Sequence, residues 1–299
     1  MAPTATAEQP LFAGPAQGKN SNAQSRIQAD PELVNYPSFP DQPETAERFY
    51  ARAYQVSDLL HQDAHIRDRG NVVPYRQVQL LKDAGLVTLL GPKKYGGGEQ
   101  PWSVAYRVVR IIAEGEGSLA QLLGYHYIWF WTATFYGTEE QRARHDQWLT
   151  ENKYLIGGAV NPRDSDLKVA PSDGSTDFSI AKTWVFNGKK TFSTGSKVSD
   201  VTILEGALVN DPSVHVFAPV ISKQPGIIYG DEWTDVLGMR GTQSGGMTID
   251  NVTIDAKDAL GFVKGQFQPL GPYNTTILPS IQVSTLRLCA ECPIITGLD

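Results

Sequence analysis

Residues 183–195 of the chain read Thr-Trp-Val-Phe-Asn-Gly-Lys-Lys-Thr-Phe-Ser-Thr-Gly. The Asn187-Gly188 pair stands between two strand-like runs, and Asn-Gly in this setting is the strongest short signal for a β-hairpin. Short β-branched runs alternate with turn residues on both sides of it, and glycine becomes frequent after Tyr154. We therefore expect residues 154–267 to form an antiparallel β-domain.

Residues 41–153 show helical periodicity instead of short β-branched runs. The stretches with apolar residues at helical spacing are 44–68, 74–84, 101–113 and 118–136. Residues 118–136 are apolar nearly all round, which is typical of a helix that is buried or lies against a large ligand. Thr138 and Gln141 occupy the N-cap and capping-box positions of one more helix. The predicted fold class is α+β, with an N-terminal all-helical domain followed by an antiparallel β-domain.

The composition of the 299 residues is that of a globular protein. A net charge of −6 disfavours nucleic acid as a partner, because phosphate binding needs a basic face. No apolar run reaches membrane-spanning length, and the N-terminus lacks the pattern of a secretory signal. The two cysteines, Cys289 and Cys292, provide no disulfide framework, which favours a cytoplasmic location. Residues 1–40 are expected to be a disordered lead-in.

Two groups of histidines could form a metal site or act in catalysis. His61 and His65 have the spacing of metal ligands on a helix, but no third ligand accompanies them, so no metal site is expected. His126 lies in the middle of the aromatic stretch 118–136. An imidazole in such a wall suits a general acid or base. The alternative is a core histidine bonded to a backbone carbonyl.

Two further clusters could contact a ligand. A flat heteroaromatic ring could pack on Phe192 while Ser193 and Thr194 hydrogen-bond its polar edge, although a plain hairpin is the alternative. Trp233 could wall a pocket and Arg240 could bind an anion or a carboxylate. The alternative for these two residues is a surface loop with a local ion pair.

Three separated groups of motifs resemble the acyl-CoA dehydrogenase family, in order, over roughly residues 43–265. They are Gly85-Leu86, Gly91-Pro92, Tyr95-Gly96-Gly97 and Gly117-Ser118-Leu119-Ala120; Asn187-Gly188-Lys189-Lys190 with Phe192 and Thr194-Gly195; and Leu237-Gly238-Met239-Arg240 with Ser244-Gly245. Within the superfamily, Gly124-Tyr125-His126 and Asp231-Glu232-Trp233 are most similar to the dibenzothiophene monooxygenase type of flavin-dependent monooxygenase.

This resemblance implies a two-component enzyme. It would take reduced flavin, FMN or FAD, from a separate flavin reductase and use O2 to oxygenate a small apolar or heteroaromatic substrate. It also implies residue roles: flavin contacts for Ala159, Val160, Asn161, Phe192, Ser193 and Thr194; hydrogen bonds to the reacting oxygen for His126 and Thr194; and a substrate pocket walled by Trp129, Trp131 and Trp233.

The same resemblance leaves alternatives. One is an acyl-CoA dehydrogenase with FAD, although Val160-Asn161 stands where that subgroup usually carries Thr-Glu. Members of the family continue into a C-terminal helical bundle through which they form homotetramers. Residues 268–299 are expected to hold only a truncated start of that bundle. An inactive remnant is therefore the third reading.

Overall fold

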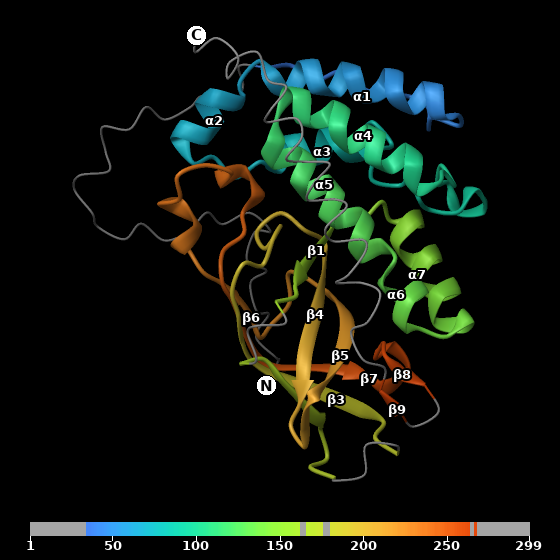
Figure 1. Ribbon diagram of the computed structural model, residues 1–299, viewed down its shortest axis with the longest axis vertical. Helices are drawn as coiled ribbons and strands as arrows, with labels where there is room; N and C mark the ends of the chain where they lie inside the picture. Colours follow the sequence, from blue (N-terminus) through green and yellow to red (C-terminus); the bar gives the residue numbers. More distant parts are fainter. Residues whose placement is uncertain (1–33, 162–165, 176–179, 264–265, 268–299) are drawn as a thin grey trace, which may run out of the picture.

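The structure is a computed structural model of the chain, and it describes residues 34–161, 166–175, 180–263 and 266–267. The helices come first along the chain and the strands second, which confirms the predicted order (Figure 1). The predictions for residues 1–33 and 268–299, including Cys289, Cys292 and the start of a helical bundle, lie outside the described residues.

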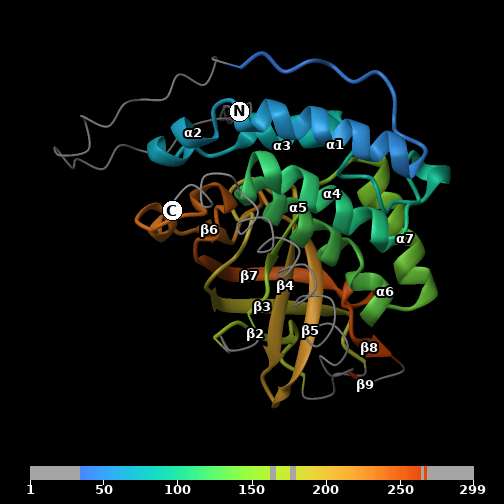
Figure 2. The same cartoon turned by 45° about the horizontal axis from the view of Figure 1, so that its top comes forward.

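The helical part is built from amphipathic helices around a common apolar cluster. Its helices are α1 (Ala46–His61), α2 (Ala64–Gly70), α3 (Tyr75–Asp83), α4 (Trp102–Gly115), α5 (Gly117–Phe130), α6 (Thr132–Tyr136) and α7 (Glu139–Glu151). The predicted helix 44–68 divides between α1 and α2, and the predicted helix 118–136 divides at Trp131. Helix α5 is apolar all round because it packs on α4 on one side and on the sheet on the other (Figure 2).

The β-part forms one curled sheet in the order β1-β4-β2-β3-β7-β6, with β5 on the other edge of β4. The strands are β1 (Ile156–Ala159), β2 (Lys168–Pro171), β3 (Thr183–Lys190), β4 (Val201–Leu208), β5 (Asp211–Ile221), β6 (Ile227–Tyr229) and β7 (Met247–Asp255); β8 (Phe262–Val263) and β9 (Gln266–Phe267) form a separate pair.

The sheet is mixed, which corrects the expectation of a purely antiparallel domain. Strands β1 and β2 both run parallel to β4, and the other pairings are antiparallel. Parallel neighbours need a long connection, and here the chain between β1 and β4 carries β2 and β3. Strand β1 was not predicted, because Ile-Gly-Gly-Ala has only one β-branched residue and two glycines, and glycine is depleted in strands.

The expected hairpin at Asn187-Gly188 is also wrong. Strand β3 runs through this pair without turning, and its register with β7 shifts between Phe186 and Gly188. Gly188 adopts a φ of 135°, and a Cβ there would lie 2.0 Å from the carbonyl oxygen of Asp166. Glycine is therefore needed for a bulge and a close backbone approach rather than for a turn.

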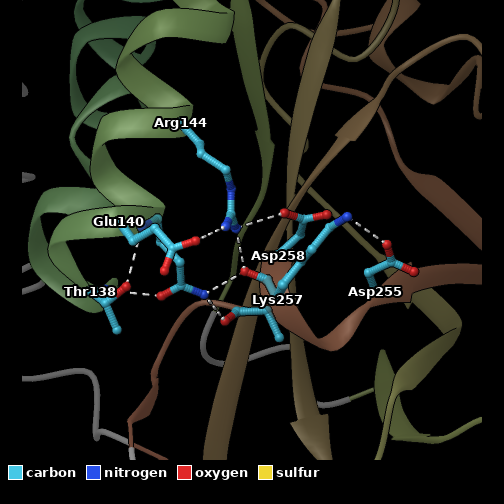
Figure 3. A network of polar contacts seen from close by, with 8 residues as sticks. Thr138, Glu140, Arg144, Asp255, Lys257 and Asp258 are labelled. Carbon is cyan, nitrogen blue, oxygen red and sulfur yellow. Dashed lines mark hydrogen bonds and ion pairs between the residues drawn. The ribbon is translucent and has the colours of Figure 1, made fainter.

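The start of α7 joins the helical part to the β-part (Figure 3). Thr138 and Gln141 form the predicted capping box. The Gln141 side-chain amide also donates to the carbonyl oxygens of Lys257 and Ala259, at 2.8 and 2.9 Å. Arg144 adds an ion pair with Asp258 at 3.2 Å. One helix end is thus both capped and fixed to the sheet.

No helix in the described ranges has the length and apolar character needed to cross a membrane.

Candidate functional site

The segment that follows β3 lies between β1 and the turn at residues 239–245. The backbone nitrogens of Ser193 and Gly195 donate to the carbonyl oxygens of Gly245 and Thr242, at 3.0 and 2.9 Å. On the other side, the nitrogen of Gly158 in β1 donates to the carbonyl oxygen of Thr194 at 3.2 Å. The predicted ring-contacting residues are therefore held on both sides by backbone hydrogen bonds.

An aromatic pair stands at the surface of this segment. Phe192 has a φ of 54° and is 64% exposed, which is an unusual conformation and environment for a bulky apolar residue. The Trp233 ring meets it edge-on, with centroids 5.9 Å apart at 79°. Trp233 is itself oriented by a 3.1 Å hydrogen bond from Nε1 to the carbonyl oxygen of Met239. Phe192 and Trp233 lie far apart in sequence, and the structure brings their rings together.

Beside this pair, the Ser193 hydroxyl is buried and has no hydrogen-bond partner among the described residues. A buried hydroxyl without a partner costs about 1–3 kcal/mol. Backbone strain of the kind seen at Phe192 is likewise concentrated at ligand sites. An orphaned hydroxyl next to an exposed ring fits a planar ligand with a polar edge, and an isoalloxazine is such a ligand.

Thr194 belongs to a chain of buried hydroxyls whose direction can be derived. Thr242 Oγ1 donates to the carbonyl oxygen of Met239 at 2.9 Å. Each hydroxyl has one proton, so Thr242 must accept from Ser244 at 2.7 Å, and Ser244 must accept from Thr194 at 3.0 Å. The proton of Thr194 is thus already donated, and its oxygen keeps only the capacity to accept.

His126 is 1% exposed, and both of its ring nitrogens are engaged by backbone groups. Nε2 lies 2.7 Å from the carbonyl oxygen of Val87, and the backbone nitrogen of Ile156 lies 3.1 Å from Nδ1. A carbonyl oxygen only accepts, so Nε2 carries the proton and the neutral tautomer is fixed. Burial lowers the pKa of His126 to about 4.

This geometry corrects the predicted catalytic role of His126. The ring has no nitrogen left for a flavin or for oxygen, and it connects the helical part to β1. The alternative reading, a core histidine bonded to a backbone carbonyl, describes it better.

Trp129 is buried against β1 rather than lining a described cavity. Its indole lies so close to Gly158 that a Cβ on Gly158 would meet ring atoms at 2.4–2.6 Å. We expect Gly158→Ala to lower the free energy of unfolding by about 1–3 kcal/mol, since overpacking a dense core costs that much. Urea denaturation would measure it.

Gly238→Ala is a matched control for Gly158→Ala, because the space around Gly238 is open. In a Trp129→Leu background the penalty of Gly158→Ala is expected to shrink to below about 0.5 kcal/mol. An equal penalty in both backgrounds would contradict this contact.

The remaining predicted residues fall into two groups. Ala159 ends β1, and Val160 and Asn161 continue from it, half-buried; the carbonyl oxygen of Asn161 accepts from Lys190 Nζ at 2.9 Å. Arg240 already has an anionic partner within the chain, because its Nη1 forms an ion pair with Asp68 Oδ2 of α2 at 2.5 Å. The reading of Arg240 as one partner of an ion pair is therefore right, although the partner is distant in sequence.

Sequence reasoning missed the buried ion pair of Lys190 and Glu205, and the bridging hydroxyl of Ser244. Glu205 is the one charged residue in the buried strand run Val201–Leu208, and that charge was the available signal. The described residues contain no group of three or more His, Cys, Asp or Glu side chains placed to hold a metal ion.

The helical layer on a curled sheet, with this site beside β1 and β3, defines an acyl-CoA dehydrogenase-like fold. Residues 44–151 match the family model of the acyl-CoA dehydrogenase N-terminal domain. The predicted resemblance is confirmed for those residues.

The relatives that resemble the chain include flavin-dependent monooxygenases. Dibenzothiophene monooxygenase of Rhodococcus qingshengii is 31% identical over 204 residues, which cover 65% of this chain and 47% of the relative. A probable FMNH2-dependent monooxygenase, SfnC of Pseudomonas putida, is 27% identical over 210 residues, covering 70% and 51%. The chain thus spans about half the length of these curated relatives.

Among solved structures, TdsC from Paenibacillus sp. A11-2 with FMN and indole superposes with a TM-score of 0.65 at 26% identity. The superposition covers 73% of this chain and 54% of TdsC.

Proposed function

We propose that the chain forms the helical and β-parts of a flavin-dependent monooxygenase that uses reduced FMN and O2. The observation that carries the proposal is the exposed Phe192–Trp233 pair beside the orphaned, buried hydroxyl of Ser193. FMN is preferred to FAD because relatives with this fold are named as FMNH2-dependent or were solved with FMN.

In this proposal each residue has a limited task. Phe192 and Trp233 pack on the flavin and exclude water, and Ser193 supplies or accepts one hydrogen bond at its polar edge. Thr194 accepts a hydrogen bond but does not donate one. Ala159, Val160 and Asn161 offer backbone groups to the flavin pyrimidine edge. The bound flavin supplies the electrons that activate O2.

The substrate in this proposal is a small apolar or heteroaromatic molecule, since TdsC was solved with indole. The dependence of a relative on FMNH2 supports a separate flavin reductase as partner. A cytoplasmic location, on the cysteine usage, and a homotetramer, on the family resemblance, also belong to the proposal. Sedimentation of the purified chain tests the tetramer.

The test begins with binding. We expect the purified 299-residue chain to quench the fluorescence of added FMN, and Phe192→Ala to raise the FMN dissociation constant about tenfold, since stacking on an aromatic ring contributes about 1–3 kcal/mol. Ile228→Ala, which removes an exposed apolar side chain on β6, is the control and should leave binding unchanged.

Turnover then separates the candidate functions. With a flavin reductase, NADH and indole, oxygen uptake should yield an oxygenated indole in proportion. Bleaching of bound FAD by an acyl-CoA would instead favour an acyl-CoA dehydrogenase. Binding of neither flavin would contradict both functions and favour an inactive protein.

A further inference from the structure

A buried ion pair lies beneath the candidate site. Lys190 Nζ, at the end of β3, is 2.6 Å from Glu205 Oε2 in β4, and the two side chains are 1% and 0% exposed. The other carboxylate oxygen of Glu205 meets Nδ1 of His215 in β5. The free-energy cost of removing two charges from water offsets most of their attraction in the core. A buried ion pair therefore adds little net stability and is weak evidence of a purely stabilising role. Its position suggests what else it does.

Glu205 stands where the neighbour of β4 changes. Strand β1 pairs with β4 up to Ala159 and Leu204, and β2 pairs with it from Ala207 onward. The ammonium of Lys190 reaches Glu205 between these two pairings. It therefore lies where the chain leaves β1, although β1 and β3 are not neighbours in the sheet.

At that point Lys190 Nζ also donates to the carbonyl oxygen of Asn161, at 2.9 Å. The Asn161 side chain donates in turn to Oγ1 of Thr191, at 3.2 Å. Asn161 is thus fixed to the end of β3 through both its main chain and its side chain. The residues just before Asn161, and those just after Thr191, are the two segments proposed above to contact flavin.

We propose that Lys190 is a positioning residue for the flavin: it fixes the spacing between segment 159–161 and segment 192–194. Glu205 neutralises the ammonium so that it can lie in the core and hold a main-chain carbonyl. The proposal rests on the function proposed above. It predicts that loss of the ammonium loosens segment 159–161 and weakens flavin binding while the fold persists.

The test uses the full chain with Lys190 and Glu205 replaced together, as Lys190→Met/Glu205→Leu, so that no buried charge is left alone. The FMN dissociation constant, read from fluorescence quenching, is expected to rise about 10–100-fold, by analogy with the loss of affinity when partners that orient metal ligands are removed. Amide hydrogen exchange in residues 156–161 of the flavin-free variant is expected to quicken.

Ser57→Ala is the structural control, because it removes a buried hydrogen bond, from Ser57 Oγ to the carbonyl oxygen of Ile111, that joins α1 to α4 within the helical part. It should leave the FMN dissociation constant and the exchange of residues 156–161 unchanged. If the double variant fails to fold, Thr191→Val serves instead: it removes the side-chain tether at an exposed position and should raise the dissociation constant about threefold, as one hydrogen bond contributes.

Unchanged FMN affinity in a folded double variant would overturn the proposal. Failure of the wild-type chain to bind FMN or FAD would instead overturn the proposed function. In that case the exchange measurement still decides on Lys190: faster exchange in residues 156–161 supports its positioning role, and unchanged exchange refutes it.

Discussion

Glu205→Ala is expected to lower the free energy of unfolding by about 3–5 kcal/mol, the cost of leaving one partner of a buried ion pair alone. The substitution leaves the Lys190 ammonium in the core without its counter-ion. Water reaches neither side chain, so solvation cannot compensate. Denaturation in urea, followed by circular dichroism, measures the loss.

The double variant Lys190→Met/Glu205→Leu provides the comparison. Replacing both charges with apolar side chains is often neutral or stabilising, so the double variant should recover most of the loss. A double variant as unstable as Glu205→Ala would show that the defect lies in packing and not in the uncompensated charge. Glu140→Ala, at an exposed i,i+4 pair with Arg144, should change stability by less than about 1 kcal/mol.

His126→Leu is expected to cost roughly 2–4 kcal/mol, because it leaves the carbonyl oxygen of Val87 and the backbone N–H of Ile156 buried without partners. His61→Gln, on the exposed end of α1, is the control and should be neutral. A loss below about 1 kcal/mol in His126→Leu would contradict the two hydrogen bonds.

The same residue links stability to pH. Burial lowers the pKa of His126 from 6.5 to about 4, so between these values the unfolded chain binds the additional proton. The stability from the neutral ring is fully present above pH 6.5 and is lost as the pH falls toward 4. Over that range wild type should lose more stability than His126→Leu, with a slope difference approaching one proton.

Glu116 affects the dependence of the free energy of unfolding on pH in the direction opposite to His126. Burial raises its pKa to about 6, so the folded chain binds its proton more readily between pH 4.5 and 6, and stability falls as the pH rises through that window. Because Glu116 is present in both proteins, its contribution cancels in the difference between wild type and His126→Leu. Identical pH slopes for the two proteins would refute the linkage to His126.

Local sequence patterns predicted the local structure well and the long-range contacts poorly. The capping box of Thr138 and Gln141 is a relation between residues three apart, and it is confirmed. Strand β1 was missed because its stability comes from pairing with β4, which lies more than forty residues later. The Asn-Gly signal failed for a similar reason: an approaching backbone at Asp166, and not a turn, requires the glycine.

In the candidate site, too, local motifs were informative and the long-range partners of the side chains were not predicted. Motifs that resemble a family predicted flavin contacts for Phe192 and Ser193 and a pocket wall for Trp233; the structure places the Phe192 and Trp233 rings in contact, and the roles stay predictions. For His126 and Arg240 the sequence offered the observed roles only as alternatives, because the partners, the backbone carbonyl of Val87 and the carboxylate of Asp68, are distant in sequence. The proton of Thr194 could be assigned only after the carbonyl of Met239 fixed the direction of the hydroxyl chain.

The side chain of Gln141 links the stability of α7 to that of the β-part. Its oxygen accepts from the backbone nitrogen of Thr138 and so completes the first turn of α7, while its nitrogen holds two carbonyl groups of the β-part. The same side chain thus serves the first turn of α7 and the contact with the β-part, so fraying of that turn is expected to weaken the contact. We expect the two parts to melt in a single transition, which differential scanning calorimetry measures.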